Sequence, residues 1–371
     1  MPLKTLNHEH AAPRKGRGAG INPEGRFEKT AREAFDDGWD APAATELAPL
    51  KTFVTEERAK SIITRNDSPD IPFTQSINPY RGCEHGCIYC YARPSHAYLN
   101  LSPGVDFETR HFAKVNAAEL LRSELAKPGY QCEVISLGAN TDPYQPIERE
   151  YRITRGILEV LAETGHPVGI VTKNAMIERD LDILVPMAKK RLVNVFISVN
   201  NLDHELARRL EPRCPAPARR LEAIRRLAAA GVPVGVLCAP VIPFLTDHQI
   251  EPVLEAAWAA GARSAGYVLM RLPWELKDLF RNWLETHYPL KAKHVMSRVH
   301  QMRGGRDNDP SFGGRMSGKG ELANLLRKRF DIACARLGFN GERMQRHAAL
   351  DTTRFKPPVA ARCAEPQLRL F

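Results

Sequence analysis

The run YRGCEHGCIYCY, residues 80–91, places three of the chain's eight cysteines, Cys83, Cys87 and Cys90, within eight positions. Thiolates are the ligands that iron–sulfur clusters require, and three thiolates on one tight loop can each bind one iron of a 4Fe-4S cluster. The fourth iron then has no protein ligand. The CxxxCxxC spacing therefore predicts a cluster with one iron open to another molecule.

Two other metal centres are compatible with these cysteines. A zinc ion could take Cys132, His85 or His96 as its fourth ligand, but structural zinc sites usually join two cysteine pairs and the sequence has no second pair. A closed, ferredoxin-like cluster is the other alternative. The remaining cysteines are scattered: Cys132, Cys214, Cys238, Cys334 and Cys363. This distribution does not resemble a disulfide framework.

The cysteine run lies near the start of a regular alternation of short apolar runs and helical patterns. Six strand–helix units follow one another between about Pro72 and His287, and each strand is almost continuously apolar, as in a parallel sheet covered by helices. No GxGxxG follows the first strand to favour a dinucleotide fold. The pattern predicts an α/β fold, a partial (β/α)6 TIM-like barrel with right-handed connections.

Polar residues follow each predicted strand at the end where barrel strands converge on one mouth. In chain order the strand ends are NPYRGC, NTDPYQPIE, TKN, SVNN, PVIP and RLP. We therefore expect these residues to gather around the cysteine loop.

These runs resemble a known family. CxxxCxxC after strand one of six βα units, with Tyr89 before the last cysteine, is similar to the signature of radical S-adenosylmethionine enzymes. The longer strings resemble the spore photoproduct lyase-related, photolyase-like branch, and most of all its uncharacterised bacterial members that share ARPSH and TDPYQPIE. They are NDSPDIPFTQSINPYRGCEHGCIYCYARPSHAY, GANTDPYQPIE, VTKN, FISVNN, LEPR, CAPVIP and LRLP. The resemblance spans about residues 50–340.

The resemblance implies that the amino and carboxylate groups of S-adenosylmethionine chelate the open iron, and that cleavage of this cofactor yields a 5′-deoxyadenosyl radical that abstracts hydrogen from a substrate. Asn140, Thr141 and Asp142 would hold the methionyl amino group, where an acidic side chain makes a charge-assisted contact. The other residues that it assigns to the cofactor are Tyr89, Lys173, Ser198 and Asn200, the last three for the methionyl carboxylate and the ribose hydroxyls. The electron donor would be a protein such as a flavodoxin or a ferredoxin.

The resemblance does not extend to the lyase's reaction. In spore photoproduct lyase a cysteine just before the Thr/Ser-Asp segment returns hydrogen to the product radical, whereas LGANTD has Ala139 there. Cys238, near the end of strand five, could lie near the mouth or be a small core residue. The substrate stays open between a nucleic acid base or lesion, a peptide and a small metabolite. A non-catalytic, cluster-containing protein that binds nucleic acid is the alternative class.

Charged residues at two further strand ends could serve the site or only the fold. Glu211 and Arg213, with Arg220 behind them, could form an ion-pair latch at the mouth or contact the cofactor carboxylate. Arg271, after strand six, could face substrate or pair with a carboxylate of the barrel.

Charge and composition divide the chain into three parts. Residues 1–50 are expected to form a flexible or loosely draped arm, residues 51–287 the barrel core, and residues 288–371 a basic C-terminal extension. The extension holds 17 Lys and Arg against 7 Asp and Glu, which accounts for the whole net charge of +10. A basic segment suits DNA or RNA, although a solvated basic face is equally compatible with it.

Two further patterns argue against other functions. GGRMSGKG, residues 313–320, nearly matches a phosphate-binding loop, but Gly320 replaces the hydroxyl that meets Mg²⁺, so we expect this loop to fold over the barrel mouth or grip a phosphate instead. No stretch approaches the roughly 18 apolar residues of a membrane span, and we expect a cytoplasmic protein.

Overall fold

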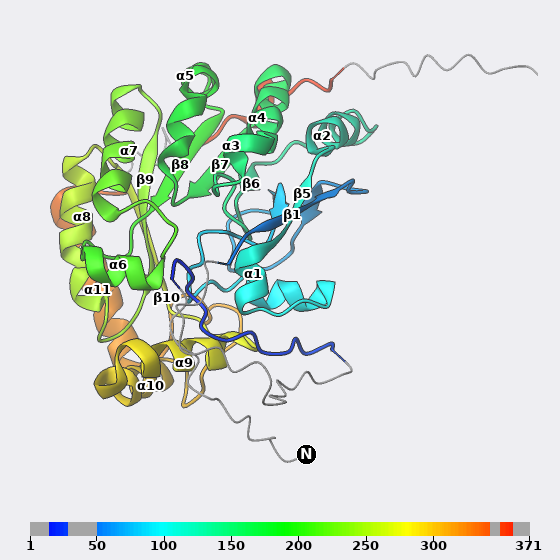
Figure 1. Cartoon of the computed structure of the whole chain (residues 1–371). Coiled ribbons are helices and arrows are strands. Elements are labelled where there is room, and N and C mark those ends of the chain that lie inside the picture. The colour runs from blue at the N-terminus through cyan, green and yellow to red at the C-terminus, as the bar shows by residue number, and fades with distance from the viewer. Residues whose placement is uncertain (1–14, 29–49, 342–348, 359–371) are drawn as a thin grey trace, which may run out of the picture.

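The computed structural model describes residues 15–28, 50–341 and 349–358 (Figure 1). Its main element is a seven-stranded sheet in the order β10-β9-β8-β7-β6-β3-β2. All neighbours pair in parallel except β2 and β3. The strands are β2 (Ile63–Arg65), β3 (Gln75–Ile77), β6 (Ile135–Leu137), β7 (Val168–Thr172), β8 (Val193–Ser198), β9 (Val234–Val241) and β10 (Ser264–Leu269). The six parallel strands are the six that the sequence predicts, and the partial (β/α)6 barrel is confirmed.

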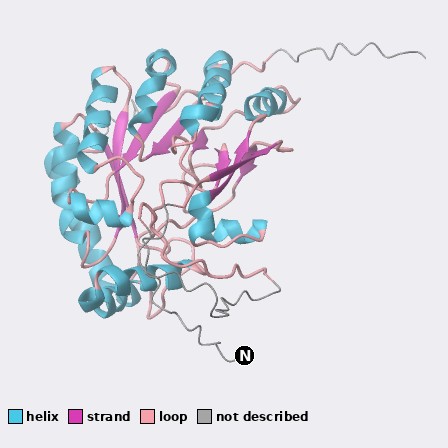
Figure 2. Cartoon of the chain, viewed as in Figure 1, coloured by secondary structure: helices cyan, strands magenta, loops and turns pink. Residues whose placement is uncertain are grey.

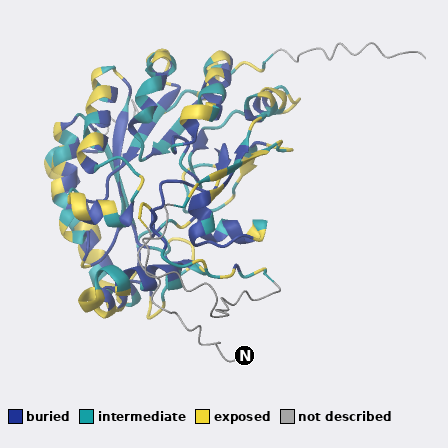
Figure 3. Cartoon of the chain, in the orientation of Figure 1, coloured by how far each residue is buried: buried dark blue, intermediate teal, exposed yellow. Residues whose placement is uncertain are grey.

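Helices cover the outer side of this curved sheet, whose strands from β3 to β9 are mostly buried, whereas the edge strands β2 and β10 are more exposed (Figures 1 and 3). The longer ones are α2 (Ala117–Leu125), α4 (Ile153–Thr164), α5 (Leu181–Lys189), α7 (Pro217–Ala229) and α8 (Ile250–Ala259). The next helix, α9 (Leu276–His287), packs instead in a second apolar cluster that contains residues of the cysteine run. Shorter helices are α1 (Val105–Thr109), α3 (Glu148–Tyr151), α6 (His204–Leu210), η1 (Arg93–Leu99), η2 (Ala175–Asp180), η3 (Asp247–Gln249) and η4 (Thr352–Arg354). Apolar residues recur at helical spacing in the longer helices, which is why the sequence predicts them.

A second sheet, which the sequence pattern does not predict, lies beside the open side of the barrel (Figure 2). It has the order β1-β5-β4 and consists of β1 (Phe53–Glu57), β4 (Tyr80–Arg81) and β5 (Arg110–Lys114). Strands such as FVTEE and RHFAK carry charges and are partly exposed, so they lack the apolar run of a core strand. Because β4 ends two residues before Cys83, this sheet holds one end of the cysteine loop.

Residues 15–28 lie draped against the core, and the flexibility expected for residues 1–50 stays a prediction. The Arg17 guanidinium is buried and donates to the Glu108 carbonyl at 2.6 Å and to the Leu50 carbonyl at 2.6 Å. Arg26 pairs with Glu275 at 3.1 Å. The rest of the predicted arm, residues 1–14 and 29–49, lies outside the described residues.

The basic segment after residue 288 shares its packing with the barrel. It contains α10 (Pro289–Met302) and α11 (Gly320–Leu337), and Leu326 and Phe330 of α11 belong to the same buried cluster as the strands. The loop between the two helices reaches back to the sheet, where the Leu269 amide donates to the Met316 carbonyl at 3.0 Å. The net charge of the chain therefore changes at residue 288, but the apolar core continues across this predicted boundary. No helix in the described part of the chain is long and apolar enough to cross a membrane.

Candidate active site

Two glycines with positive φ shape the cysteine loop that follows β3 and β4. Gly82 has φ +76°, and a Cβ there would lie 2.6 Å from Cδ2 of His111. Gly86 has φ +68°, and its amide donates to the Cys83 carbonyl at 3.4 Å. Both conformations are costly for residues with a side chain. The backbone therefore turns tightly just before Cys83 and again just before Cys87.

Arg93, fully buried just after the loop, anchors the loop from within. Its guanidinium forms four hydrogen bonds to backbone carbonyls, those of Gly86 at 3.1 Å, Cys87 at 2.9 Å, Pro103 at 3.2 Å and Gly104 at 2.9 Å. It also pairs with the buried Glu108 carboxylate. That carboxylate accepts from the Gly18 amide at 2.9 Å and the Ala19 amide at 2.8 Å. One arginine thus ties the cysteine loop to α1 and to the N-terminal segment.

The three predicted ligands, Cys83, Cys87 and Cys90, lie together on this loop and are largely shielded from water. Cys83 and Cys87 are buried, and Cys90 is half-buried. Burial raises the pKa of the Cys90 thiol to about 12. Within the described ranges, no three His, Cys, Asp or Glu side chains are arranged to hold one metal ion. A cubane cluster has a different requirement, since each cysteine binds its own iron.

A fourth thiol, which sequence reasoning missed, lies beside the cluster ligands. Cys214 Sγ is 3.7 Å from Cys87 Sγ. The contact follows from backbone pairing, because the Ile88 amide donates to the Leu210 carbonyl at 3.0 Å and the Arg213 amide donates to the His85 carbonyl at 3.2 Å. A hydrogen bond from Cys214 is the main cause that lowers the pKa of Cys87. The signal in the sequence was the LEPRC run, which begins at the last residue of α6 (His204–Leu210).

Buried charges lie next to these thiols. Tyr89 donates its hydroxyl hydrogen bond to Glu211, which also pairs with Arg220. Glu211 therefore forms a buried pair with Arg220 and not with Arg213, which pairs at 2.8 Å with Glu84.

Lys173, at the end of β7, places its ammonium 5.9 Å from the centre of the Tyr89 ring. Burial alone would lower its pKa, but the neighbouring Cys87 and Glu211 raise it. Among the described residues no carboxylate forms an ion pair with this ammonium, which suits an anionic ligand.

The predicted residues after β6 are held in place by contacts within the protein. The amides of Asn140 and Thr141 donate to Asn78 Oδ1 at 2.8 and 3.3 Å. The Asp142 carboxylate accepts from Thr172 Oγ1 at 2.6 Å, as well as from the amides of Tyr144 and Lys173.

Asp142 also faces the cysteine loop, because His85 Nδ1 lies 3.4 Å from its carboxylate. Burial alone would raise the pKa of Asp142, but His85 and the hydrogen bonds from Thr172 and the Lys173 amide lower it to about 2. Asp142 therefore joins the ends of β6 and β7 to the cysteine loop, and its contact with the cofactor stays a prediction.

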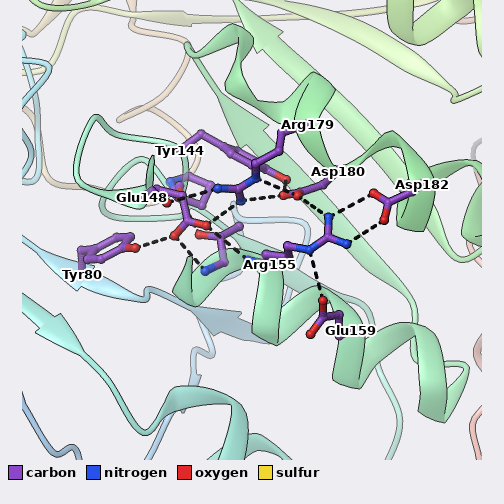
Figure 4. A network of polar contacts seen from close by, with 10 residues as sticks. Tyr80, Tyr144, Glu148, Arg155, Glu159, Arg179, Asp180 and Asp182 are labelled. Carbon is purple, nitrogen blue, oxygen red and sulfur yellow. Dashed lines mark hydrogen bonds and ion pairs between the residues drawn. The ribbon is translucent and has the colours of Figure 1, made fainter. Parts of the chain in front are cut away.

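Tyr144 and Glu148, later in the TDPYQPIE run, belong to a network of polar contacts (Figure 4). Tyr144 donates to Asp180 at 3.0 Å, and Glu148 pairs with Arg179 at 2.7 Å while accepting from Tyr80. These buried contacts hold the strand end that carries residues 140–142.

Ser198 and Asn200, at the end of β8, are buried beside Arg220. The Ser198 carbonyl accepts from Arg220 at 3.1 Å, and Asn200 Oδ1 accepts from Asn201 at 2.8 Å. Asn200 Nδ2 is buried without a hydrogen-bond partner. A buried donor of this kind costs about 1–3 kcal/mol unless a ligand satisfies it, so the amide fits the ribose role that the sequence predicts.

Two further candidates have clear positions. Cys238 is a buried core residue in the same apolar cluster as Cys334, so it is the small core residue that the sequence allowed and not a thiol at the mouth. Arg271 lies 5.7 Å from the centre of the Tyr91 ring and donates to Met316 Sδ at 3.4 Å, with no ion pair to a described carboxylate. The glycine-rich loop therefore reaches the end of β10, near the residue that follows Cys90.

Comparison with known proteins agrees with this geometry. The family model of the Radical SAM superfamily matches residues 77–257. An uncharacterised protein of Mycobacterium tuberculosis is 38% identical over 245 residues, which are 65% of this chain and 71% of that protein. An uncharacterised protein of Methanocaldococcus jannaschii is 27% identical over 249 residues, which are 67% of this chain and 89% of that protein.

Solved structures show the same fold. A spore photoproduct lyase mutant with bound AdoMet and a dinucleoside spore photoproduct has a TM-score of 0.54 and 15% identity, over 77% of this chain and 80% of that chain. Another mutant of that lyase has a TM-score of 0.54 and 17% identity, over 81% and 86% of the two chains. At this identity the likeness concerns the fold alone.

Proposed function

The chain belongs to the radical SAM superfamily, and we propose that it is an enzyme that binds a 4Fe-4S cluster through Cys83, Cys87 and Cys90. When bound, the cluster and S-adenosylmethionine would supply a reductively formed 5′-deoxyadenosyl radical that abstracts hydrogen from a substrate. The observation that carries the proposal is the set of three shielded cysteines on one anchored loop, at the strand ends that hold Lys173 and Asn200.

In this proposal each strand end has a binding task. Lys173 offers a positive charge to the methionyl carboxylate. Asn200, with Ser198 beside it, offers an unpaired amide to the ribose. Residues 140–142 lie at the adjacent strand end and line the place for the methionyl amino group. Tyr89 and Glu211 keep the loop positioned over these groups and exclude water.

The ligand assignment can be tested by changing one thiol. After anaerobic reconstitution, dithionite and S-adenosylmethionine should yield 5′-deoxyadenosine, and Cys87→Ala should abolish it. Cys132→Ala is the matched control, because Cys132 is a half-buried thiol that precedes β6, at the other end of the barrel. Undiminished product from Cys87→Ala would contradict the assignment.

The cofactor assignment has a separate test. Asn200→Ala should weaken S-adenosylmethionine binding, measured by equilibrium dialysis, with iron content unchanged. Asp142→Ala is expected to weaken binding too, but a parallel loss of iron would assign Asp142 a purely structural role, since it pairs with His85 of the cysteine loop.

For the substrate we propose a nucleic acid, supported by basic residues on the surface of the C-terminal segment. Lys293, Arg306 and Lys328 are exposed there. Deleting residues 288–371 is not a clean test, because Phe330 of α11 belongs to the main core. Changing the three exposed residues to Gln should weaken oligonucleotide binding and reduce its salt dependence by about one unit of slope per lost phosphate contact.

Three outcomes of these experiments separate the alternatives. Absence of salt-dependent binding by the unaltered protein would favour a peptide or small metabolite. Binding without release of 5′-deoxyadenosine would favour a non-catalytic nucleic-acid-binding protein. Salt-dependent binding together with release of 5′-deoxyadenosine, and with label transferred from a deuterated oligonucleotide into that product, would establish the proposed reaction class.

A further inference from the structure

A basic hollow of about 480 Å³ opens on the surface next to the cysteine loop. Arg149, Arg213 and Arg219 line it, and Met176 contributes apolar surface together with alanine and proline residues. No carboxylate and no aromatic ring is among the described residues that line it. The hollow is therefore positively charged at its rim and partly apolar inside.

Two residues of its wall touch the cysteine loop. Cys214 lines the hollow, and its Sγ lies 3.7 Å from Cys87 Sγ. Asn174 also lines it, and its Nδ2 lies 3.2 Å from His85 Nε2. The wall between the hollow and a predicted cluster ligand is consequently one side chain thick.

The arginines of the rim are held at the surface. Arg213 pairs with Glu84 at 2.8 Å and Arg219 pairs with Glu178. The two arginine side chains are nevertheless 38% and 42% exposed to solvent. Arg149 is exposed and forms no ion pair within the described part of the chain. Charges that are already positioned lose little conformational freedom when a partner binds.

We propose that this hollow docks a small acidic electron-transfer protein, which reduces the cluster through the Cys214–Cys87 contact. One electron leaves the reduced carrier, which is oxidised by one electron, and the cluster is reduced by one electron, while no bond or proton is exchanged. The inference rests on the proposed function, because it requires the cluster.

The shape and chemistry of the hollow favour a protein over a nucleic acid. Single-stranded nucleic acids bind through aromatic rings on which bases stack, and none of the described residues that line the hollow is aromatic. An apolar centre with a charged rim is typical of protein interfaces, and redox partners use small ones. The contact with Cys87 adds a reason for an electron carrier in particular.

The test measures binding of oxidised flavodoxin to the cluster-loaded protein by calorimetry, and reduction of the cluster by photoreduced flavodoxin by electron paramagnetic resonance. Arg149→Glu should weaken flavodoxin binding at least tenfold and slow cluster reduction by flavodoxin, and it should leave reduction by dithionite unchanged. Arg149→Glu with Arg219→Gln should weaken binding further. Arg122→Glu on α2 is the control, an exposed arginine that pairs with Glu163 and is expected to bind flavodoxin normally.

Each other outcome contradicts the docking site. Equal flavodoxin affinity for the Arg149→Glu variant and the unaltered protein would overturn it, and so would a loss of oligonucleotide binding in place of flavodoxin binding. The proposed function fails by a different result, namely no 5′-deoxyadenosine from the unaltered protein with dithionite. The variant Arg149→Gln repeats the comparison without a reversed charge, should the glutamate variants not fold.

Discussion

Replacing Arg93 by Met tests whether the buried guanidinium holds the cysteine loop. The change keeps the length of the side chain but removes four hydrogen bonds to backbone carbonyls and the pairing with Glu108. Both side chains of this pair are fully buried, so Glu108 would keep a buried charge with, among the residues that the structure describes, only the amides of Gly18 and Ala19 as donors. Removal of one partner of a buried ion pair costs about 3–5 kcal/mol.

That cost would be a large part of the roughly 5–15 kcal/mol that stabilises a typical domain. It corresponds to about a 10²- to several 10³-fold increase in the ratio of unfolded to folded chain. Urea unfolding of the cluster-free protein measures it, and iron per chain after reconstitution reports on the loop itself. We expect Arg93→Met to retain markedly less iron, because the carbonyls of Gly86 and Cys87 lose their anchor.

Arg122→Met provides the matched control, since Arg122 and Glu163 form an ion pair with side chains 45% and 54% exposed. Such surface pairs contribute about 0–1 kcal/mol. Glu108→Gln added to Arg93→Met should recover part of the stability by removing the unpaired charge. The reasoning would be refuted if Arg93→Met lost less than about 1 kcal/mol and kept full iron.

Three further changes test other parts of the argument. Gly82→Ala should reduce both stability and iron retention, because its Cβ would lie 2.6 Å from His111. Gly129→Ala, at φ +78° in open space, should lose only the ~1 kcal/mol of stability that the left-handed conformation costs, and equal urea midpoints for the two variants would contradict this. Burial lowers the pKa of His166 to about 4, so between pH 6.5 and 4 the unfolded chain binds a proton that the folded chain does not, and this residue alone lowers stability by up to ~3 kcal/mol as the pH falls. His166→Gln should make the pH dependence shallower in urea titrations at several pH values, with the share of the buried His96 and His111 remaining, and an unchanged slope would argue against it. Phe330→Ala should lower the unfolding free energy by about 3–5 kcal/mol if α11 belongs to the barrel core. Leu325 is 53% exposed, so Leu325→Ala should change the unfolding free energy by less than ~0.5 kcal/mol, and a small effect of both changes would mean that the C-terminal segment is peripheral to the core.

The ligand loop and the barrel could be predicted from the sequence because both are encoded locally. Cys83, Cys87 and Cys90 lie within eight residues, so their spacing alone limits the metal centres that they can bind. The six strands are nearly continuous apolar runs separated by helical patterns, and such periodicity reflects burial directly. The ends of parallel strands must share one edge of a sheet, which is why Lys173 and Asn200 could be assigned to the same mouth.

Only the tertiary structure decided which distant segments meet there. Cys214 is 127 positions from Cys87, and their contact depends on the backbone pairing of residues 85–88 with residues 210–213. Glu108 likewise joins Arg93 to residues 18 and 19, which lie in a segment whose composition predicts a flexible arm. A pattern of residue types records how strongly a segment is buried, but the partner that buries it is selected by shape and hydrogen bonding across the whole fold. The position of each chemically important side chain relative to the others therefore follows from packing that no single stretch of sequence contains.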